Sequence, residues 1–142
     1  MRKLTLLILF VVTSCRRGSA GGGALTGAGA PRKAVEQFLA AVKAQDLQAM
    51  SVVWGTERGP ARDHMDRSEL EKRELIMQQC FNHDRFTIVD EGPGVSGRRV
   101  IKVQVARGTR SKTPSFTAVK GPSERWYVLD GDIVAMQEFC RS

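Results

Sequence analysis

Apolar residues recur with a helical period in the first half of the chain. Between residues 31 and 46 they stand three or four positions apart, at Val35, Phe38, Leu39 and Val42. This spacing predicts an amphipathic helix, because positions three and four apart share one face of a helix. Asp46 is suited to be an N-cap, which predicts a second, short helix that ends at Gly55.

A third helix is predicted from the N-cap Asp66 to about Phe81. Glu69 follows Asp66 by three residues, which is the spacing of a capping box. We expect one face of this helix to hold its apolar residues, Leu70, Met77, Cys80 and Phe81.

Beyond residue 84 the apolar period changes to two. Within 98–108 apolar and polar residues alternate, and the apolar ones are Ile101, Val103 and Val105. This alternation predicts a half-buried strand. Further strands are predicted between turn-forming residues, at 85–89, 113–120, 125–130 and 133–139. Helices followed by four or five hairpin-linked strands predict the α+β class, with the helices packed on one face of an antiparallel sheet.

The first residues follow another pattern. Two basic residues precede an aliphatic run from Leu4 to Val12, which is too short to span a membrane. The run ends in VVTSC, which resembles the lipobox of bacterial lipoproteins. The resemblance implies a signal peptide over 1–14 and a lipid on Cys15, the first residue of the mature chain. The alternative is an ordinary secretory signal cleaved near Ala20, with Cys15 incidental.

Residues 16–31 are rich in glycine, with six glycines among sixteen residues. Such a segment lacks the apolar surface needed to offset its chain entropy. We therefore predict a lipidated cysteine and flexible tether over 15–31 and one folded domain over 32–142. The expected location is extracytoplasmic, with the lipid anchoring the protein to the cell membrane or the outer membrane.

The other two cysteines, Cys80 and Cys140, remain as a pair in an oxidising compartment. They predict a disulfide bond between the third helix and the end of the chain. The alternative is that Cys80 is a buried free thiol. No CxxC sequence is present, so neither a redox motif nor a cysteine-rich zinc site is supported.

The net charge of +7 is concentrated in part on one predicted hairpin. Its basic residues are Arg98, Arg99, Lys102, Arg107, Arg110 and Lys112. Such a cluster predicts either a patch that binds anionic lipid or cell-wall polymer, or the protection of a sheet edge by charge. Outside the cytoplasm, nucleic acid is not an expected partner.

The first helix AVEQFLAAVKAQD, the LQAM helix and the WYVLD strand together resemble the NTF2-like (cystatin-like α+β) superfamily, in particular its small lipoproteins of unknown role. The resemblance implies a curved sheet that wraps the helices into a cone. Members use the open end of the cone for catalysis, binding or dimerisation. If the cone is open here, we expect its lining to include Met50, Trp54, Trp126 and Met136.

Motifs that would assign a reaction are missing from the sequence. It contains no nucleophile elbow, no phosphate-binding loop and no metal-ligand spacing, so we predict no catalytic residue, metal or cofactor. We expect a membrane-anchored, non-catalytic domain that binds a partner protein, such as a second copy of itself, or a small ligand. One alternative is a basic module for anionic polymer or lipid. The other is a small isomerase or dehydratase-like enzyme, which needs a titratable residue deep in the pocket.

Overall fold

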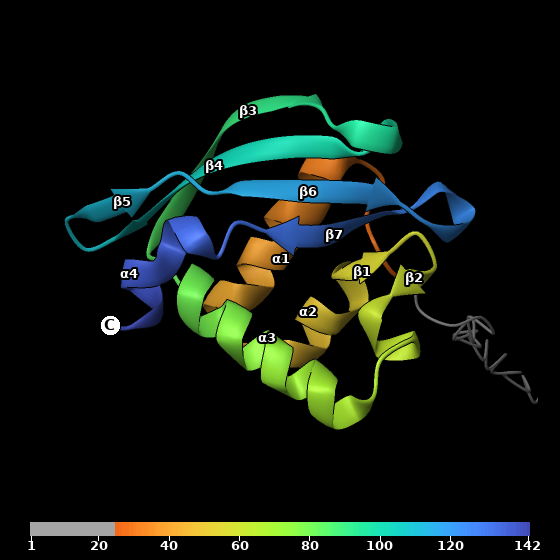
Figure 1. The fold of residues 1–142 in the computed structure, drawn as a ribbon, viewed down its shortest axis with the longest axis horizontal. Helices are drawn as coiled ribbons and strands as arrows, with labels where there is room; N and C mark the ends of the chain where they lie inside the picture. The colour runs from red at the N-terminus through yellow and green to blue at the C-terminus, as the bar shows by residue number, and fades with distance from the viewer. Residues whose placement is uncertain (1–24) are drawn as a thin grey trace, which may run out of the picture.

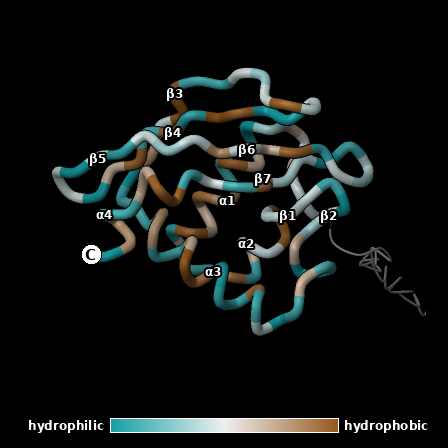
Figure 2. The backbone as a smooth tube through the Cα atoms, in the orientation of Figure 1, coloured by the Kyte–Doolittle hydropathy of each residue, from teal (hydrophilic) through white to brown (hydrophobic). Residues whose placement is uncertain are grey.

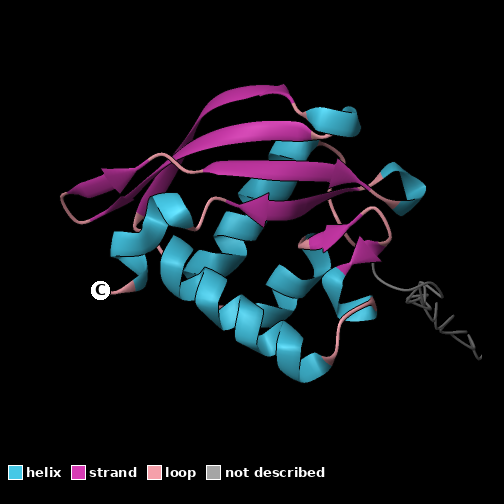
Figure 3. Ribbon diagram, in the orientation of Figure 1, coloured by secondary structure: helices cyan, strands magenta, loops and turns pink. Residues whose placement is uncertain are grey.

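An antiparallel sheet of five strands curves over the helices in residues 25–142, the part of the chain that the computed structural model describes (Figures 1 and 3). The strand order is β3-β4-β6-β7, and the short β5 pairs with β4. The strands are β3 (Arg85–Pro93), β4 (Arg99–Arg107), β5 (Arg110–Lys112), β6 (Ser115–Lys120) and β7 (Trp126–Gly131). The signal peptide, the lipobox and Cys15 lie outside the described residues.

Three helices precede the sheet: α1 (Pro31–Ala44), α2 (Leu47–Val53) and α3 (Arg67–Phe81). Asp46 accepts a hydrogen bond from the amide of Ala49 at 2.9 Å, and Asp66 accepts one from the amide of Ser68 at 3.0 Å. Both are therefore N-caps. The α+β class predicted from the sequence is confirmed. No helix among the described residues is long and apolar enough to cross a membrane.

The core lies between α1 and the concave face of the sheet. The three apolar residues of β4 predicted from the alternation are buried, as is Ala106, and the polar residues between the three are exposed. Rings from α1, α3 and β6 meet in the centre, with centroids 5.0 to 6.3 Å apart, at Phe38, Phe81 and Phe116. Figure 2 shows apolar residues in the middle of most strands and helices and polar residues at most turns.

Two short strands connect α2 to α3. β1 (Gly55–Thr56) and β2 (Gly59–Pro60) form a hairpin, which the 3₁₀ turn η1 (Ala61–Asp63) follows. Trp54, at the start of this segment, forms a parallel bridge with Val128 of β7. The hairpin therefore covers the free edge of β7.

Residues 26–30 of the glycine-rich segment bond to the folded domain, which corrects the predicted boundary at residue 31. Ala28 is fully buried and exchanges two backbone hydrogen bonds of 2.8 Å with Trp126. Gly27 has a φ of +67°, and a Cβ atom there would lie 2.8 Å from the carbonyl oxygen of Trp126. Glycine therefore serves a close backbone approach here, which composition alone cannot distinguish from a flexible tether.

The predicted last strand over 133–139 is wrong. The chain instead forms the 3₁₀ turn η4 (Val134–Met136) and the short helix α4 (Gln137–Cys140). Asp132 accepts a hydrogen bond from the amide of Ala135 at 3.0 Å and so starts a helical turn. Met136 and Phe139, three residues apart, are both fully buried. Their spacing is therefore helical.

A disulfide bond joins Cys80 of α3 to Cys140 of α4, with the two Cα atoms 4.1 Å apart. The predicted pairing is confirmed, and the alternative of a free thiol at Cys80 is wrong. The bond holds the C-terminal end of the chain against the helical layer.

Candidate functional site

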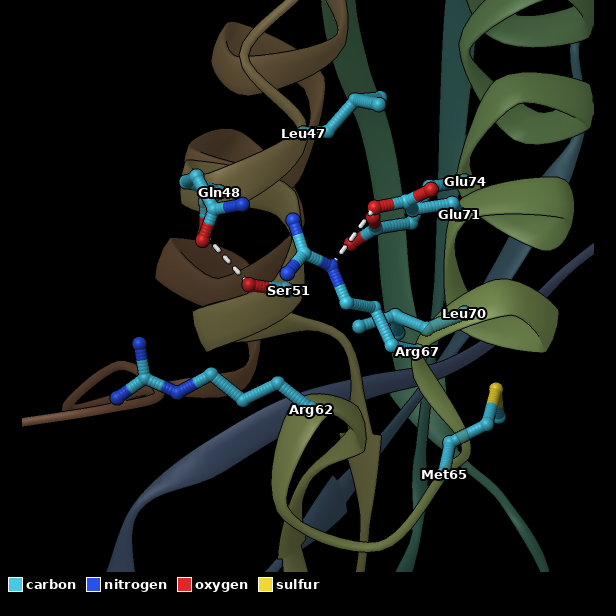
Figure 4. A pocket seen from close by; sticks show the side chains of 9 residues that line it. All are labelled: Leu47, Gln48, Ser51, Arg62, Met65, Arg67, Leu70, Glu71 and Glu74. Carbon is cyan, nitrogen blue, oxygen red and sulfur yellow. Dashed lines mark hydrogen bonds and ion pairs between the residues drawn. The ribbon is translucent and has the colours of Figure 1, made fainter.

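A cavity of about 360 Å³ opens between α2, η1 and the N-terminal half of α3 (Figure 4). We call it the α2–α3 cavity. Its lining comes from helices and turns alone and consists of Leu47, Gln48, Ser51, Arg62, Met65, Arg67, Leu70, Glu71 and Glu74. It therefore lies outside the space between helices and sheet where the sequence placed a pocket.

Glu74 occupies a position of α3 where an apolar side chain would be expected. It stands four residues after Leu70 and three before Met77, so all three share the buried face of the helix. Only 2% of Glu74 is exposed. The periodicity of the sequence predicts the apolar residues of this face but not Glu74. The signal that could have found it is a charged residue inside an apolar stripe.

The carboxyl group of Glu74 is unsatisfied. Its Oε1 atom is buried and has no hydrogen-bond partner among residues 25–142. Burial and, to a smaller extent, the nearby Glu71 carboxylate together raise the pKa of Glu74 to about 7. A buried polar atom without a partner costs free energy, so such an atom in a folded protein calls for an explanation.

The cavity lining around Glu74 contains both polar and apolar side chains. Glu71 accepts a hydrogen bond from Arg67 Nε at 3.1 Å. Figure 4 shows the Arg67 side chain extending from α3 toward Gln48 and Ser51 of α2. Ser51 is buried, and its hydroxyl donates to the backbone carbonyl of Gln48 at 2.7 Å. The apolar part of the lining is Leu47, Met65 and Leu70.

Arg62 makes little contribution to the field at Glu74. In Figure 4 its guanidinium points away from the two carboxyl groups. It lies 3.6 Å from the carboxylate of its neighbour Asp63 instead. The charges nearest to Glu74 within the cavity are therefore those of Glu71 and Arg67.

This arrangement allows two kinds of chemistry. A carboxyl group with a pKa near 7 populates both its protonated and ionised forms at neutral pH, so it can exchange a proton with a bound molecule. In its ionised form it can also pair with a cationic ligand. A metal centre is not supported, because residues 25–142 contain no group of three or more His, Cys, Asp or Glu side chains placed to hold a metal ion.

The four residues expected to line a cone pocket do not line one together. Met50 and Met136 are fully buried in the core. Trp54 lines a separate cavity of about 290 Å³ beside Met65, and the ring of Trp126 is half-buried with the Lys120 ammonium 5.4 Å from its centroid. Aromatic and aliphatic side chains fill the interior that the resemblance described as open.

The six basic residues do not form one anion-binding patch. Arg98 and Arg99 lie at one end of β4, and Arg107, Arg110 and Lys112 lie at the other, roughly 26 Å away along a strand of this length. Three of the six pair with acidic side chains: Arg98 with Glu57, Arg99 with Glu91, and Lys112 with Glu138. Arg98 Nε has no hydrogen-bond partner within residues 25–142, but the same guanidinium donates through Nη2 to Glu57 at 2.8 Å.

Arg107 has a structural role. Its guanidinium donates to the backbone carbonyls of Gln79, Asn82 and Phe139 at 2.8 to 3.0 Å. It also donates to the Ser142 hydroxyl at 2.7 Å and lies over the ring of Phe139. Since the last carbonyls of a helix lack partners within the helix, Arg107 satisfies the C-terminal end of α3.

No protein-family model matches the chain, and no curated protein matches it either. Among solved structures it is similar to Bal32a, from a soil-derived mobile gene cassette. The similarity covers 78% of this chain and 96% of Bal32a, at 18% sequence identity and a TM-score of 0.38. A similarity at this level carries no argument about function.

Proposed function

We propose that this protein is a lipid-anchored, extracytoplasmic lipoprotein of the NTF2-like type, whose domain binds a small ligand in the α2–α3 cavity. The VVTSC sequence at the end of an aliphatic run supports the anchor. The cavity supports the binding function, because its volume of about 360 Å³ is in the range of small-molecule sites.

The observation that carries the proposal is the unpartnered carboxyl group of Glu74 beside this cavity. An apolar side chain at position 74 would complete the buried face of α3 and would avoid the cost of burying a carboxyl group. Folding alone therefore does not account for the glutamate. A ligand that supplies the missing hydrogen bond does account for it.

A second candidate function is proton transfer to a substrate. It is favoured by the pKa of Glu74, which burial places near neutral pH, where a general acid or base works best. Binding is the stronger proposal because two polar groups that could assist a proton transfer are already engaged. The Ser51 hydroxyl donates to a backbone carbonyl, and Glu71 is paired with Arg67.

The binding function is tested by amide NMR of the full-length protein with three probes of equal length: n-hexylammonium, 1-hexanol and hexanoate. We expect at least one probe to shift the amide signals of α2 and of the first two turns of α3. The same probe should leave these signals unchanged in the Glu74→Leu variant, whose added apolar side chain replaces the carboxyl group. If none of the three probes shifts these amides, the proposed function is wrong.

The anchor is tested separately by mass spectrometry of the protein produced in a bacterial host. We expect a mature chain that begins at Cys15 and carries acyl chains, and we expect Cys15→Ser to remain unprocessed or to leave the membrane fraction. An unmodified mature chain that begins at another residue would contradict the lipoprotein assignment.

A further inference from the structure

The chemistry around Glu74 also indicates what kind of ligand the α2–α3 cavity takes. Two carboxyl groups, Glu71 and Glu74, face the cavity from neighbouring positions of α3. Because Arg67 already pairs with Glu71, the ionised Glu74 is the carboxylate left to attract a cation and to repel an anionic ligand. A charged donor also gains more than a neutral one from a desolvated carboxylate.

Arg67 shows which cationic chemistry this site accepts. Its Nε donates to Glu71 at 3.1 Å, so a nitrogen-bound proton already satisfies one of the two carboxyl groups. The Arg67 side chain is 87% exposed, and such exposed pairs are weak. The arginine also leaves Oε1 of Glu74 without a donor. A second nitrogen cation can therefore enter without breaking a strong contact.

The rest of the lining favours a cation that carries a short apolar part. Leu47, Met65 and Leu70 offer apolar surface, and the volume of about 360 Å³ is much larger than an ammonium group needs. The Ser51 hydroxyl uses its proton on the Gln48 carbonyl, so the oxygen retains lone pairs that accept another N–H. A bare metal ion fits poorly, since hard cations take six or more oxygen ligands and the cavity offers two carboxyl groups.

We infer that the ligand of the α2–α3 cavity is a small amphiphilic amine: a primary ammonium or guanidinium group paired with Glu74, on a short apolar stem that packs against Leu47, Met65 and Leu70. This inference rests on the proposed binding function. Because the carboxyl group must be ionised to form the ion pair, binding of the cation releases the proton that Glu74 holds. Affinity therefore increases with pH.

The charges that face Glu74 set this pH dependence. On α3 they are Glu71 and Arg67, and on η1 the nearest is Arg62, which points away. The α2 residues of the lining, Leu47, Gln48 and Ser51, carry no charge. Since the pKa of Glu74 is about 7, ionisation is nearly complete at pH 8 and slight at pH 5.5. The affinity for a cation should change roughly 30-fold between these two values.

The test is calorimetry of the full-length protein with n-hexylammonium, n-hexylguanidinium, 1-hexanol and hexanoate at pH 8 and pH 5.5. We expect one or both cations to bind roughly 30-fold more tightly at pH 8, with a proton released on binding near pH 6.5. The alcohol and the carboxylate should bind at least tenfold more weakly than the cation. The ammonium and guanidinium arms decide which of the two head groups the site prefers.

Glu74→Gln should weaken cation binding at pH 8 at least tenfold and remove its pH dependence. Glu124→Gln, at a side chain that is 87% exposed, is the matched control and should bind as the wild type does. If 1-hexanol or hexanoate binds as tightly as the cations, or if Glu74→Gln retains cation binding, the ligand class is wrong while the binding function stands. If none of the probes binds, both proposals fail.

Discussion

Two charged side chains that contact α3, one at its C-terminal end and one at its middle, differ in whether they have partners. At the C-terminal end, the Arg107 guanidinium satisfies the carbonyls that close the helix, and the Cys80–Cys140 bond fixes α4 beside it. Every nitrogen of this guanidinium has an acceptor. At the middle of the same helix, Glu74 is buried with an oxygen that has no donor among the described residues.

The Arg107 charge stabilises the fold, whereas the Glu74 carboxyl group is free to bind a ligand. Removing Arg107 would leave several backbone carbonyls without a donor, so the fold depends on it. Removing the charge of Glu74 would relieve a burial cost, so the fold does not depend on it. Mutations of Arg107 and Glu74 should therefore change stability with opposite signs.

The largest effect is expected from the disulfide bond at the C-terminal end of α3. The Cys80→Ala/Cys140→Ala double variant opens a loop of 60 residues, and we expect it to lower the free energy of unfolding by about 4 kcal/mol. Urea denaturation of both proteins in a Cys15→Ser background measures the change. A loss below about 1 kcal/mol would show that this end does not depend on the bond. Thiol titration of the unfolded, non-reduced Cys15→Ser protein should find no free thiol.

Arg107→Met should cost about 3 kcal/mol, because the carbonyls of Gln79, Asn82 and Phe139 lose a charged donor. Arg110→Met is the matched control: Arg110 also lies over the Phe139 ring but is exposed. We expect this control to cost less than about 1 kcal/mol in urea denaturation. Equal losses for the two variants would mean that the ring contact, and not the helix end, holds Arg107.

Glu74→Gln should act in the opposite direction. An acid whose pKa is higher in the folded state than in the unfolded state stabilises the fold at any pH below its unfolded-state pKa. This contribution is lost as the pH rises through the folded-state pKa. For Glu74 the window runs from 4.5 to about 7. The variant should therefore match the wild type near pH 4 and exceed it at pH 8, by at most about 3 kcal/mol.

Unfolding in urea at pH 4, 6 and 8 measures this difference between variant and wild type, with Glu124→Gln as the exposed control. A difference that does not grow between pH 4 and pH 8 would show that Glu74 titrates as an ordinary glutamate.

The smallest effects are expected at the basic residues. Arg98→Glu/Arg99→Glu and Arg110→Glu/Lys112→Glu alter opposite ends of β4, roughly 26 Å apart, which exceeds the Debye length of about 8 Å at physiological salt. Adsorption of the full-length protein to anionic vesicles should therefore weaken additively, with each pair contributing independently. Cosedimentation measures this. If charge reversal of one pair alone abolishes adsorption, the basic residues act as a single anion-binding patch and the additive account is wrong.

The sequence predicts those features that local periodicity and capping determine. The first three helices, two of them with the caps Asp46 and Asp66, and the alternation of β4 follow from neighbours in the chain. The C-terminal helix is predicted as a strand because two apolar residues, Met136 and Phe139, are too few to distinguish a helical period from a strand period.

The candidate site could not be predicted because it depends on contacts between distant segments. Glu74 is an ordinary charged residue until α2 covers it, and only then does it lack a donor. The basic residues near 98–112 are close in sequence but far apart in the structure. Residues adjacent in sequence were separated by the length of β4 and paired with acids from β3, from the β1–β2 turn and from α4.

The most direct test of the account is the titration of the Glu74 side-chain carboxyl group by ¹³C NMR in the full-length protein. With the signal assigned by its absence in Glu74→Gln, we predict a pKa of about 7, and a lower pKa when n-hexylammonium is added. A pKa near the ordinary value of 4.5, unchanged by the amine, would contradict both the burial of this group and its role as the anchor of the α2–α3 cavity.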